Sequence, residues 1–270
     1  MNKRYLGALI ISPLIIFLFV GGSFLRYGLM VLSIFGLFEF FNAIRKKGIK
    51  PLSFFAYIAT VVYYVFLRSK FVSNDHFFEY LFGILVLSII VLMCYVVINP
   101  KHTIVDVAIT ILGLLYVSIF FGYIVLVNQK EYGYYLLWLI FLSSWLCDTG
   151  AYFTGRFFGK HKLSPKVSPN KTIEGSIGGL ILSCLACGIF GMIIRNYDVS
   201  IALYNFFLIG LICGVLCQFG DLIASSIKRY IGIKDYSNLI PGHGGILDRF
   251  DSILFAAPIV YYYITFILGM

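Results

Sequence analysis

Long apolar stretches separated by short polar segments dominate the chain. Nine of them are long enough, or nearly so, to cross roughly 30 Å of hydrocarbon as helices. They span 5–25, 28–44, 52–68, 76–98, 103–127, 134–155, 172–194, 203–227 and 250–269. The second and third are short for a span and could be tilted, half-inserted or bent. Alternating ten-residue segments typical of a β-barrel are few. The pattern predicts an all-α, polytopic integral membrane protein with about nine transmembrane helices.

The basic residues predict the orientation of these helices. With the N-terminus in the cytoplasm, 16 of the 21 Lys and Arg residues fall on the cytoplasmic side and 5 on the other. This is the asymmetry of the positive-inside rule. The apolar run after Lys3 and Arg4 continues without a clear cleavage site, so we interpret it as a retained span rather than a signal peptide. A bacterial inner membrane is the expected location.

Composition agrees with the membrane assignment. The chain is 60% hydrophobic and 12% charged, whereas soluble domains carry about 25% charged residues. Much of the net charge of +9 is assigned to the cytoplasmic side, where it faces anionic lipid. We expect membrane lipid, and no nucleic acid, as a partner.

The two parts of the chain differ in polarity. Residues 1–130 are expected to form N-terminal transmembrane helices with few charged groups inside the spans. Glu39 and Asp106 are exceptions, for which interfacial exposure or a helix–helix hydrogen bond is the simpler interpretation. Residues 131–270 hold most of the unusual polar groups and are expected to form a catalytic region with cytoplasmic loops at 156–171 and 228–249.

Small residues in the last spans indicate close helix packing. Gly175 and Gly179 form a G-x-x-x-G pattern on the seventh span, and Gly210 and Gly214 form another on the eighth. This spacing favours close approach of helix backbones. It predicts packing between these two spans or a homodimer contact. The six cysteines all fall within predicted spans, and we interpret them as small packing residues.

The first long loop combines carboxylate, cations and hydroxyls. Asp148 and Tyr152 share one helix face shortly before Arg156. Basic residues in this loop are also what positive-inside topology requires, but that does not explain the run "SPNKTIEGS". There Asn170, Lys171 and Thr172 lie at the start of a helix, where backbone N–H groups and the helix dipole favour a phosphate.

The eighth span carries a polar stripe. Gln218, Asp221, Ser225 and Lys228 are spaced so that they lie along one helix face. A carboxylate inside the span needs a cation partner. Lys228, Arg229 or a metal ion could supply it, and a salt bridge alone would also explain the pattern.

The segment "IPGHGGILDRFDS" at 240–252 precedes the last span. Its glycines permit a tight backbone close to a ligand, and Asp248 and Asp251 lie three residues apart at a helix start. A Gly-rich loop closed by a helix-capping Asp is the simpler interpretation. Carboxylate oxygens near Lys and Arg instead suit Mg²⁺ and phosphates. Together with the first loop, the segment indicates a cytoplasmic site for phosphoryl-type transfer to a lipid phosphate.

A family resemblance sharpens this hypothesis. The run "SSIKRYIGIKDYSNLIPGHGGILDRFD" at 225–251 resembles the signature of the phosphatidate cytidylyltransferases, and "CDTGAYFTGRFFGKHKLSPKVSPNKTIEGSIGG" is similar to a second region of that family. The resemblance implies a nucleotidyltransferase of phospholipid biosynthesis. Such enzymes convert CTP and phosphatidate to CDP-diacylglycerol and diphosphate with Mg²⁺.

The resemblance also implies roles for particular residues. Metal-binding carboxylates fall at Asp221 and Asp248, and we add Asp251 and Asp148. Phosphate contacts are expected from Lys166, Lys171, Lys228 and Arg229. His243 is expected to assist a proton or bind phosphate. The remaining expected substrate-binding residues are Arg156, Ser168, Asn170, Thr172, Gly244 and Gly245.

Two other classes use similar residues. A CTP-dependent lipid kinase would employ the same polar groups but release CDP. A transporter or anion channel also places charges in Gly-interrupted spans. However, the polar groups here gather on one predicted membrane side, and the first half of the chain has almost no charge in the middle of a span.

Overall fold

The computed structural model describes residues 19–68, 77–242 and 244–270. Its helices confirm the all-helical membrane fold. Seven of them are long and apolar enough to cross a membrane, and Ser53–Phe66 is a shorter apolar helix. At 14 residues, this helix extends about 21 Å, less than a bilayer core. The first predicted span, 5–25, lies largely outside the described residues, so the structure does not account for all nine predicted spans.

The chain divides into two compact units. The first comprises residues 1–125 and 235–248, and the second comprises residues 126–234 and 249–270. The segment 235–248 therefore packs with helices that precede it by more than a hundred residues in the sequence.

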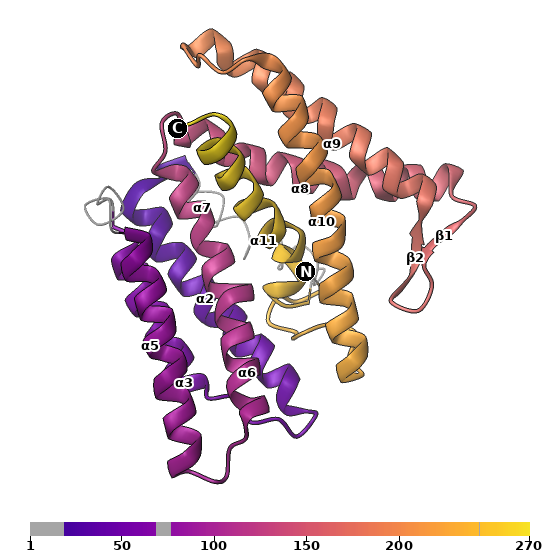
Figure 1. Ribbon diagram of the computed structural model, residues 1–270. Coiled ribbons are helices and arrows are strands. Elements are labelled where there is room, and N and C mark those ends of the chain that lie inside the picture. Colours follow the sequence, from indigo (N-terminus) through magenta and orange to yellow (C-terminus); the bar gives the residue numbers. More distant parts are fainter. Residues whose placement is uncertain (1–18, 69–76, 243) are drawn as a thin grey trace. The chain divides into compact units, whose positions relative to one another are not determined.

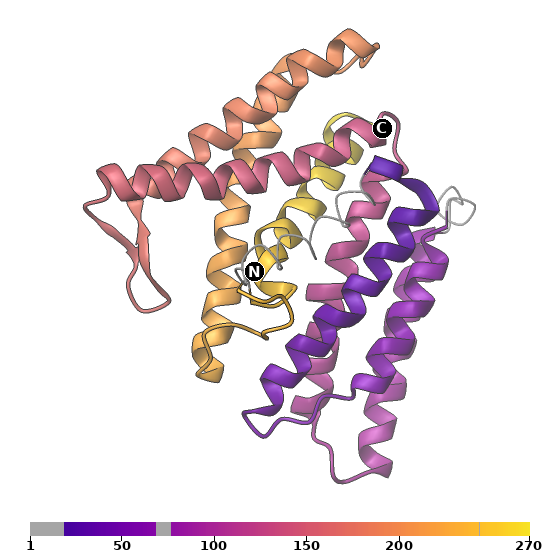
Figure 2. The ribbon, with the colours of Figure 1, turned by 180° about the vertical axis from the view of Figure 1, so that it is seen from behind.

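In the described residues, the first unit contains five α-helices and a π-helical turn. They are α2 (Gly22–Arg45), α3 (Ser53–Phe66), α5 (Phe77–Ile98), α6 (Ile104–Gly113), the turn Leu114–Ile119, and most of α7 (Phe120–Asn128). Helices α2, α3 and α6 contact one another, and α5 contacts α3 and α6, as can be followed in Figures 1 and 2. The core includes the fully buried side chains of Phe40, Phe41, Tyr64 and Phe121.

The start of α2 differs from the prediction. The second span was expected from residue 28, but α2 begins at Gly22. Arg26 suggested a boundary between spans, yet it lies inside the helix at 7% exposure. Its guanidinium group lies 4.7 Å from the ring centre of Tyr27, which is favourable for a cation near an aromatic face.

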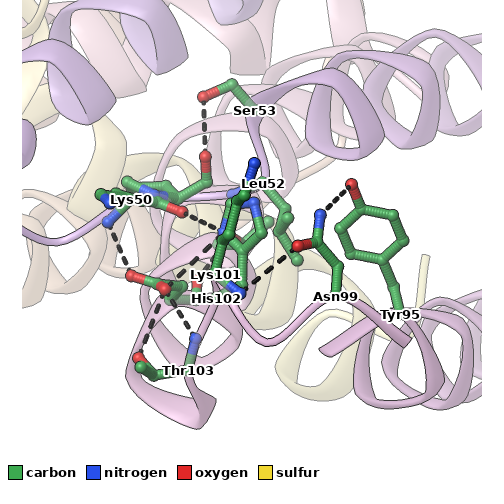
Figure 3. Close-up of polar contacts among 11 residues, drawn as sticks. Lys50, Leu52, Ser53, Tyr95, Asn99, Lys101, His102 and Thr103 are labelled. Carbon is green, nitrogen blue, oxygen red and sulfur yellow. Dashed lines mark hydrogen bonds and ion pairs between the residues drawn. The ribbon is translucent and has the colours of Figure 1, made fainter. Parts of the chain in front are cut away.

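The buried carboxylates of the first unit bind backbone amides. Asp106 is 4% exposed and accepts hydrogen bonds from the backbone N–H groups of Thr103 at 2.8 Å and Lys50 at 2.6 Å (Figure 3). With Thr103 it forms a capping box at the start of α6. Glu39 is 2% exposed and also binds backbone amides. Interfacial exposure was therefore the wrong interpretation for both. The helix–helix hydrogen bond is confirmed for Glu39, because one of its donors is the N–H of Leu247, the first residue of α11 (Leu247–Tyr262).

The second unit is built on three long helices. These are α8 (Gly133–Phe158), α9 (Ile173–Ile194) and α10 (Leu203–Ile231). The strands β1 (Lys162–Ser164) and β2 (Ser168–Thr172) form an antiparallel hairpin between α8 and α9, visible at their junction in Figure 1. Helix α11 (Leu247–Tyr262) begins in the segment of the first unit and continues in the second, ending in a π-helical turn at Tyr263–Ile267.

The predicted loops are shorter than expected because the helices extend into them. Helix α8 continues to Phe158, so Arg156 lies in its last turn. Helix α10 continues to Ile231, so Lys228 and Arg229 are helical. Gly232, at φ 86°, ends this helix, a conformation that glycine adopts without strain.

The two glycine pairs face different helices. A Cβ at Gly210 would lie 2.7 Å from the Ser183 carbonyl oxygen of α9. The expected contact between the seventh and eighth spans is therefore confirmed on the α10 side. Gly179 instead faces α8, where a Cβ would lie 2.7 Å from the Cys147 carbonyl oxygen. Both pairs are thus used in packing within this unit. All six cysteines are free thiols.

Candidate functional site

A cavity of about 430 Å³ lies in the second unit. Side chains from α8, β2, α9 and α10 line it, together with Leu163 of the hairpin. Six predicted site residues are among them: Asp148, Arg156, Asn170, Lys171, Thr172 and Asp221. The structure therefore brings together polar groups from two sequence regions about fifty residues apart, as a substrate site requires.

Two residues that line the cavity, Lys171 and Asp221, form an ion pair. The ammonium group of Lys171 lies 2.6 Å from Asp221 Oδ2, and the two side chains are 24% and 28% exposed. Ser225, one turn further along α10, donates a hydrogen bond to Asp221 Oδ1 at 3.3 Å. The expected cation partner is present, but it is Lys171 rather than Lys228 or Arg229. Strand β2 carries Lys171 to the start of α9, which packs against α10.

Three predicted metal-binding carboxylates belong to the second unit. Asp148, Asp221 and Asp251 lie within electrostatic range of one another, and Lys228 lies within range of Asp251. Asp251 and Lys228 are each 8% exposed. Gly220 permits this arrangement, because a Cβ there would lie 2.6 Å from the Asp251 carbonyl oxygen. Negative charge gathered in this way attracts a cation.

The start of α9 borders the same cavity. Thr172 is its N-cap and accepts a hydrogen bond from Gly175 N–H at 3.1 Å. A Cβ at either Gly155 or Gly175 would lie 2.9 Å from Thr172 Oγ1. The positive end of the helix dipole therefore lies at the cavity wall, where it favours an anionic group.

Ser176 and Gln218 also line the cavity, and their contact was not predicted from the sequence. Ser176 donates a short hydrogen bond to Gln218 Oε1. In return, Gln218 Nε2 donates to the Ser176 carbonyl oxygen at 3.1 Å and contacts the Cys147 sulfur at 3.6 Å. These contacts fix α9 against α10. Gln218 was expected on the polar stripe of α10, and the stripe residues Gln218 and Ser225 are 8% and 9% exposed.

Other predicted residues lie elsewhere in the second unit. Lys166 and Ser168 belong to the hairpin but are not among the residues that line the cavity. Arg229 donates hydrogen bonds to the carbonyl oxygens of Val167 at 3.4 Å and Ile233 at 3.1 Å. Its guanidinium group thereby connects the hairpin turn to the end of α10.

The Gly-rich segment belongs to the first unit as far as Asp248. Gly242 and Gly244 have φ values of 78° and 80°, which glycine adopts readily. Ile240 N–H donates to the Gly244 carbonyl oxygen at 2.8 Å. Asp248 Oδ2 accepts from the N–H groups of Tyr236 and Gly245, both at 2.9 Å. The expected tight turn and its closing carboxylate are both present, and His243 lies outside the described residues.

The donor chemistry suits a hard cation. In the described part of the chain, no group of three or more His, Cys, Asp or Glu side chains is arranged to hold a metal ion. Mg²⁺ commonly uses one or two carboxylates and completes its shell with water and substrate phosphates. Asp148 and Asp221 provide such oxygen donors within one cavity. The residues therefore fit Mg²⁺ chemistry.

Comparison with known proteins places these features in a family. A model of the cytidylyltransferase family matches residues 2–267. The chain is 32% identical to a phosphatidate cytidylyltransferase of Bacillus subtilis over 268 residues, 97% of each chain. It is 36% identical to one of Staphylococcus haemolyticus over 266 residues, 96% of this chain and 97% of that protein. Over 178 residues, 66% of each chain, it is 40% identical to one of Staphylococcus saprophyticus. The family model and the first two relatives cover nearly the whole chain, which shows that the chain belongs to the cytidylyltransferase family.

Proposed function

We propose that this integral membrane protein transfers the cytidylyl group of CTP to phosphatidate, giving CDP-diacylglycerol and diphosphate. The observation that carries the proposal is the cavity lined by Lys171, Arg156 and Asp221 in a chain matched by the cytidylyltransferase family along nearly its whole length. Cations suit the phosphates of CTP, and relatives from three bacteria bear the name phosphatidate cytidylyltransferase.

The reaction requires positioning and charge neutralisation. An oxygen of the phosphatidate phosphate attacks the α-phosphorus of CTP, and the bond to the β-phosphate oxygen breaks to release diphosphate. A phosphate monoester is largely ionised near neutral pH, because its second pKa is about 6. The attacking oxygen therefore needs no covalent nucleophile and no strong base. Lys171 and Arg156 would hold the negatively charged groups in line.

The neutral groups of the cavity would orient the nucleotide. The side-chain amide of Asn170, which lines the cavity, would donate to phosphate oxygens, and the dipole of α9 favours an anion at this end. Lys166, Ser168, Lys228, Arg229, Gly244 and Gly245 remain predicted substrate contacts. His243 keeps its predicted role of assisting a proton or binding phosphate.

Mg²⁺ is the proposed cofactor. Asp221 and Asp248 are the first proposed ligands, followed by Asp251 and Asp148. When bound, the cation neutralises phosphate charge and makes the α-phosphorus more electrophilic. The carboxylates supply the hard oxygen atoms that this ion prefers.

The proposed location is a bacterial inner membrane with the site open to the cytoplasm. The 16 to 5 division of basic residues supports a cytoplasmic N-terminus. Single cysteines introduced at Lys166 and at Asp198, in a background without native cysteines, would test this orientation in whole cells. A membrane-impermeant thiol reagent reaching the hairpin position from outside would overturn it.

Product analysis tests the activity. Purified protein is incubated with CTP labelled in its α-phosphate, phosphatidate and Mg²⁺. We expect label in CDP-diacylglycerol and release of diphosphate, each dependent on phosphatidate. Release of CDP with a phosphorylated lipid would favour a lipid kinase, and flux without turnover would favour a transporter.

Two substitutions test the proposed ligands. Asp221→Asn and Asp248→Asn should each lower kcat by at least about 100-fold, comparable with loss of a group that stabilises transition-state charge. Asp198→Asn removes an exposed carboxylate and serves as the control. Full activity in either of the first two variants would remove that residue from the metal assignment.

A further inference from the structure

Glu39, on the first-unit helix α2, binds the segment 235–248 at Ser237 and again at Ile246 and Leu247. Its Oε1 accepts hydrogen bonds from the Ser237 hydroxyl at 2.5 Å and from Ile246 N–H at 2.9 Å. Its Oε2 accepts from Leu247 N–H at 2.9 Å. One buried carboxylate therefore connects residues ten positions apart in the segment to a helix from the opposite end of the sequence.

The surface of α2 is shaped for this segment. A Cβ on Gly245 would lie 2.5 Å from Glu39 Oε1 and 2.6 Å from Oε2, so no larger residue fits without movement. One turn earlier on α2, a Cβ at Gly36 would lie 3.2 Å from Leu247 Cδ2. Leu247 is fully buried. Gly36 and Glu39 thus lie on the same face of α2. Gly36 leaves room for the Leu247 side chain, and Glu39 accepts hydrogen bonds from backbone amides.

Glu39 also satisfies amides that the helix itself leaves open. Ile246 and Leu247 stand at the start of α11, where backbone N–H groups have no acceptor within the helix. A carboxylate near this end is favoured by the helix dipole. The hydrogen bonds in turn compensate for burying the carboxylate, which would otherwise be costly. Glu39 is therefore a capping group supplied by a distant helix.

The same segment holds Asp248. Gly245 N–H points to Asp248 Oδ2, whereas the next two amides along the chain point to Glu39. Tyr236 N–H is the second donor to Asp248 Oδ2. Two carboxylates thus share the amides of one short turn, and a shift of the turn away from Glu39 would change the hydrogen bonds that orient Asp248.

We propose that Glu39 is a positioning residue for the proposed reaction, fixing Ser237, Ile246 and Leu247 at the two ends of the turn and thereby the orientation of Asp248. The inference rests on the proposed function, in which Asp248 binds Mg²⁺. Glu39 acts through hydrogen bonds to the turn. Groups that orient a metal ligand commonly change metal affinity or activity by 10–100-fold when altered.

Asp106 provides a matched control. It is also a buried carboxylate of the first unit that binds backbone amides (Figure 3). In the described residues its carboxylate accepts hydrogen bonds from Lys50 and Thr103, and His102 Nδ1 lies 3.7 Å from Oδ2. All three partners lie outside the turn. Asp106→Asn and Glu39→Gln therefore remove similar charges, while only the second change affects the turn.

Hydrogen exchange of the metal-free protein is the first measurement. Glutamine offers one acceptor oxygen and places an NH₂ group where the other oxygen stood. It cannot serve both amides, so Glu39→Gln should accelerate exchange at Ile246 or Leu247 by about tenfold or more. Asp106→Asn should leave exchange across 236–247 unchanged. Unchanged exchange in Glu39→Gln would overturn the inference without any reference to catalysis.

Mg²⁺ titration of activity is the second measurement. Glu39→Gln should raise the Mg²⁺ concentration for half-maximal rate by about 10–100-fold, whereas Asp106→Asn should change it by no more than about twofold. A common loss of thermal stability in both variants, with wild-type Mg²⁺ dependence in Glu39→Gln, would mean a purely structural role and overturn the inference.

Ser237→Ala provides a second test in case the Glu39→Gln variant does not fold. It removes one of the three donors, so it should shift both exchange and Mg²⁺ dependence in the same direction by a smaller factor. Wild-type values for both would contradict the inference. If the wild-type protein forms no CDP-diacylglycerol, the proposed function fails, and the exchange measurement still decides whether Glu39 fixes the turn.

Discussion

Replacing Lys171 by Met tests the ion pair in the candidate site. Methionine keeps much of the apolar stem but removes the ammonium group that lies 2.6 Å from Asp221 Oδ2. The Ser225 hydroxyl, at 3.3 Å from Oδ1, is a weaker partner because it carries no charge. The variant should therefore destabilise the protein through loss of charge pairing.

The size of the effect follows from the partial exposure of the pair. Two unit charges at about 4 Å interact by about 4 kcal/mol at an effective dielectric constant of about 20. Fully exposed pairs contribute only about 0–1 kcal/mol because water screens them. Lys171 and Asp221 are 24% and 28% exposed, between these cases. We expect a coupling free energy of about 1–2 kcal/mol.

A double-mutant cycle measures this coupling. Denaturant unfolding in one detergent is compared among the wild type, Lys171→Met, Asp221→Asn and the double variant. Lys171→Met should cost more when Asp221 is present than when it is Asn. Lys162→Met, which alters an exposed hairpin cation, should show no coupling to Asp221. A Lys171–Asp221 coupling below about 0.3 kcal/mol, the usual limit of additivity, would refute the reasoning.

Two further predictions concern the scaffold of the site, both measured by unfolding. Gly210→Ala should destabilise by about 1–3 kcal/mol, because its Cβ would lie 2.7 Å from a backbone oxygen and 2.9 Å from Cys184 Cα; the control Gly83→Ala meets no atom within 4 Å and should be neutral or stabilising by up to about 1 kcal/mol. Equal effects would contradict the packing argument. Thr172→Ala should cost about 1 kcal/mol by removing the cap of α9, while Thr172→Ser keeps the accepting oxygen and most of the stability. A fully stable Thr172→Ala would show that the cap contributes little.

Most spans could be predicted because a helix in lipid must be apolar and satisfy its own backbone groups. Errors arose at the ends of spans. Arg26 was expected between the first two spans, yet it is buried within α2 beside Tyr27. The ends of α8 and α10 were placed too early because their basic last turns resemble loops, although cations are favourable at a helix C-terminus.

The composition of the site was easier to predict than its contacts. Helical spacing was sufficient to predict the stripe on α10, since it involves one helix. The Lys171–Asp221 pair joins positions fifty residues apart, so it depends on how the hairpin and α9 pack against α10. Sequence spacing carries no information about that packing. The hairpin itself lacks the alternating apolar pattern from which strands are recognised.

Glu39, Asp106 and Asp221 look alike in the sequence, since each is an acidic residue within an apolar span near its polar end. The structure separates them by their partners. Glu39 and Asp106 bind backbone amides, which are fixed by the fold and leave these carboxylates little freedom. Asp221 instead pairs with the ammonium group of Lys171, a side chain that also lines the cavity. The kind of partner, more than depth in the span, therefore distinguishes Asp221 from Glu39 and Asp106.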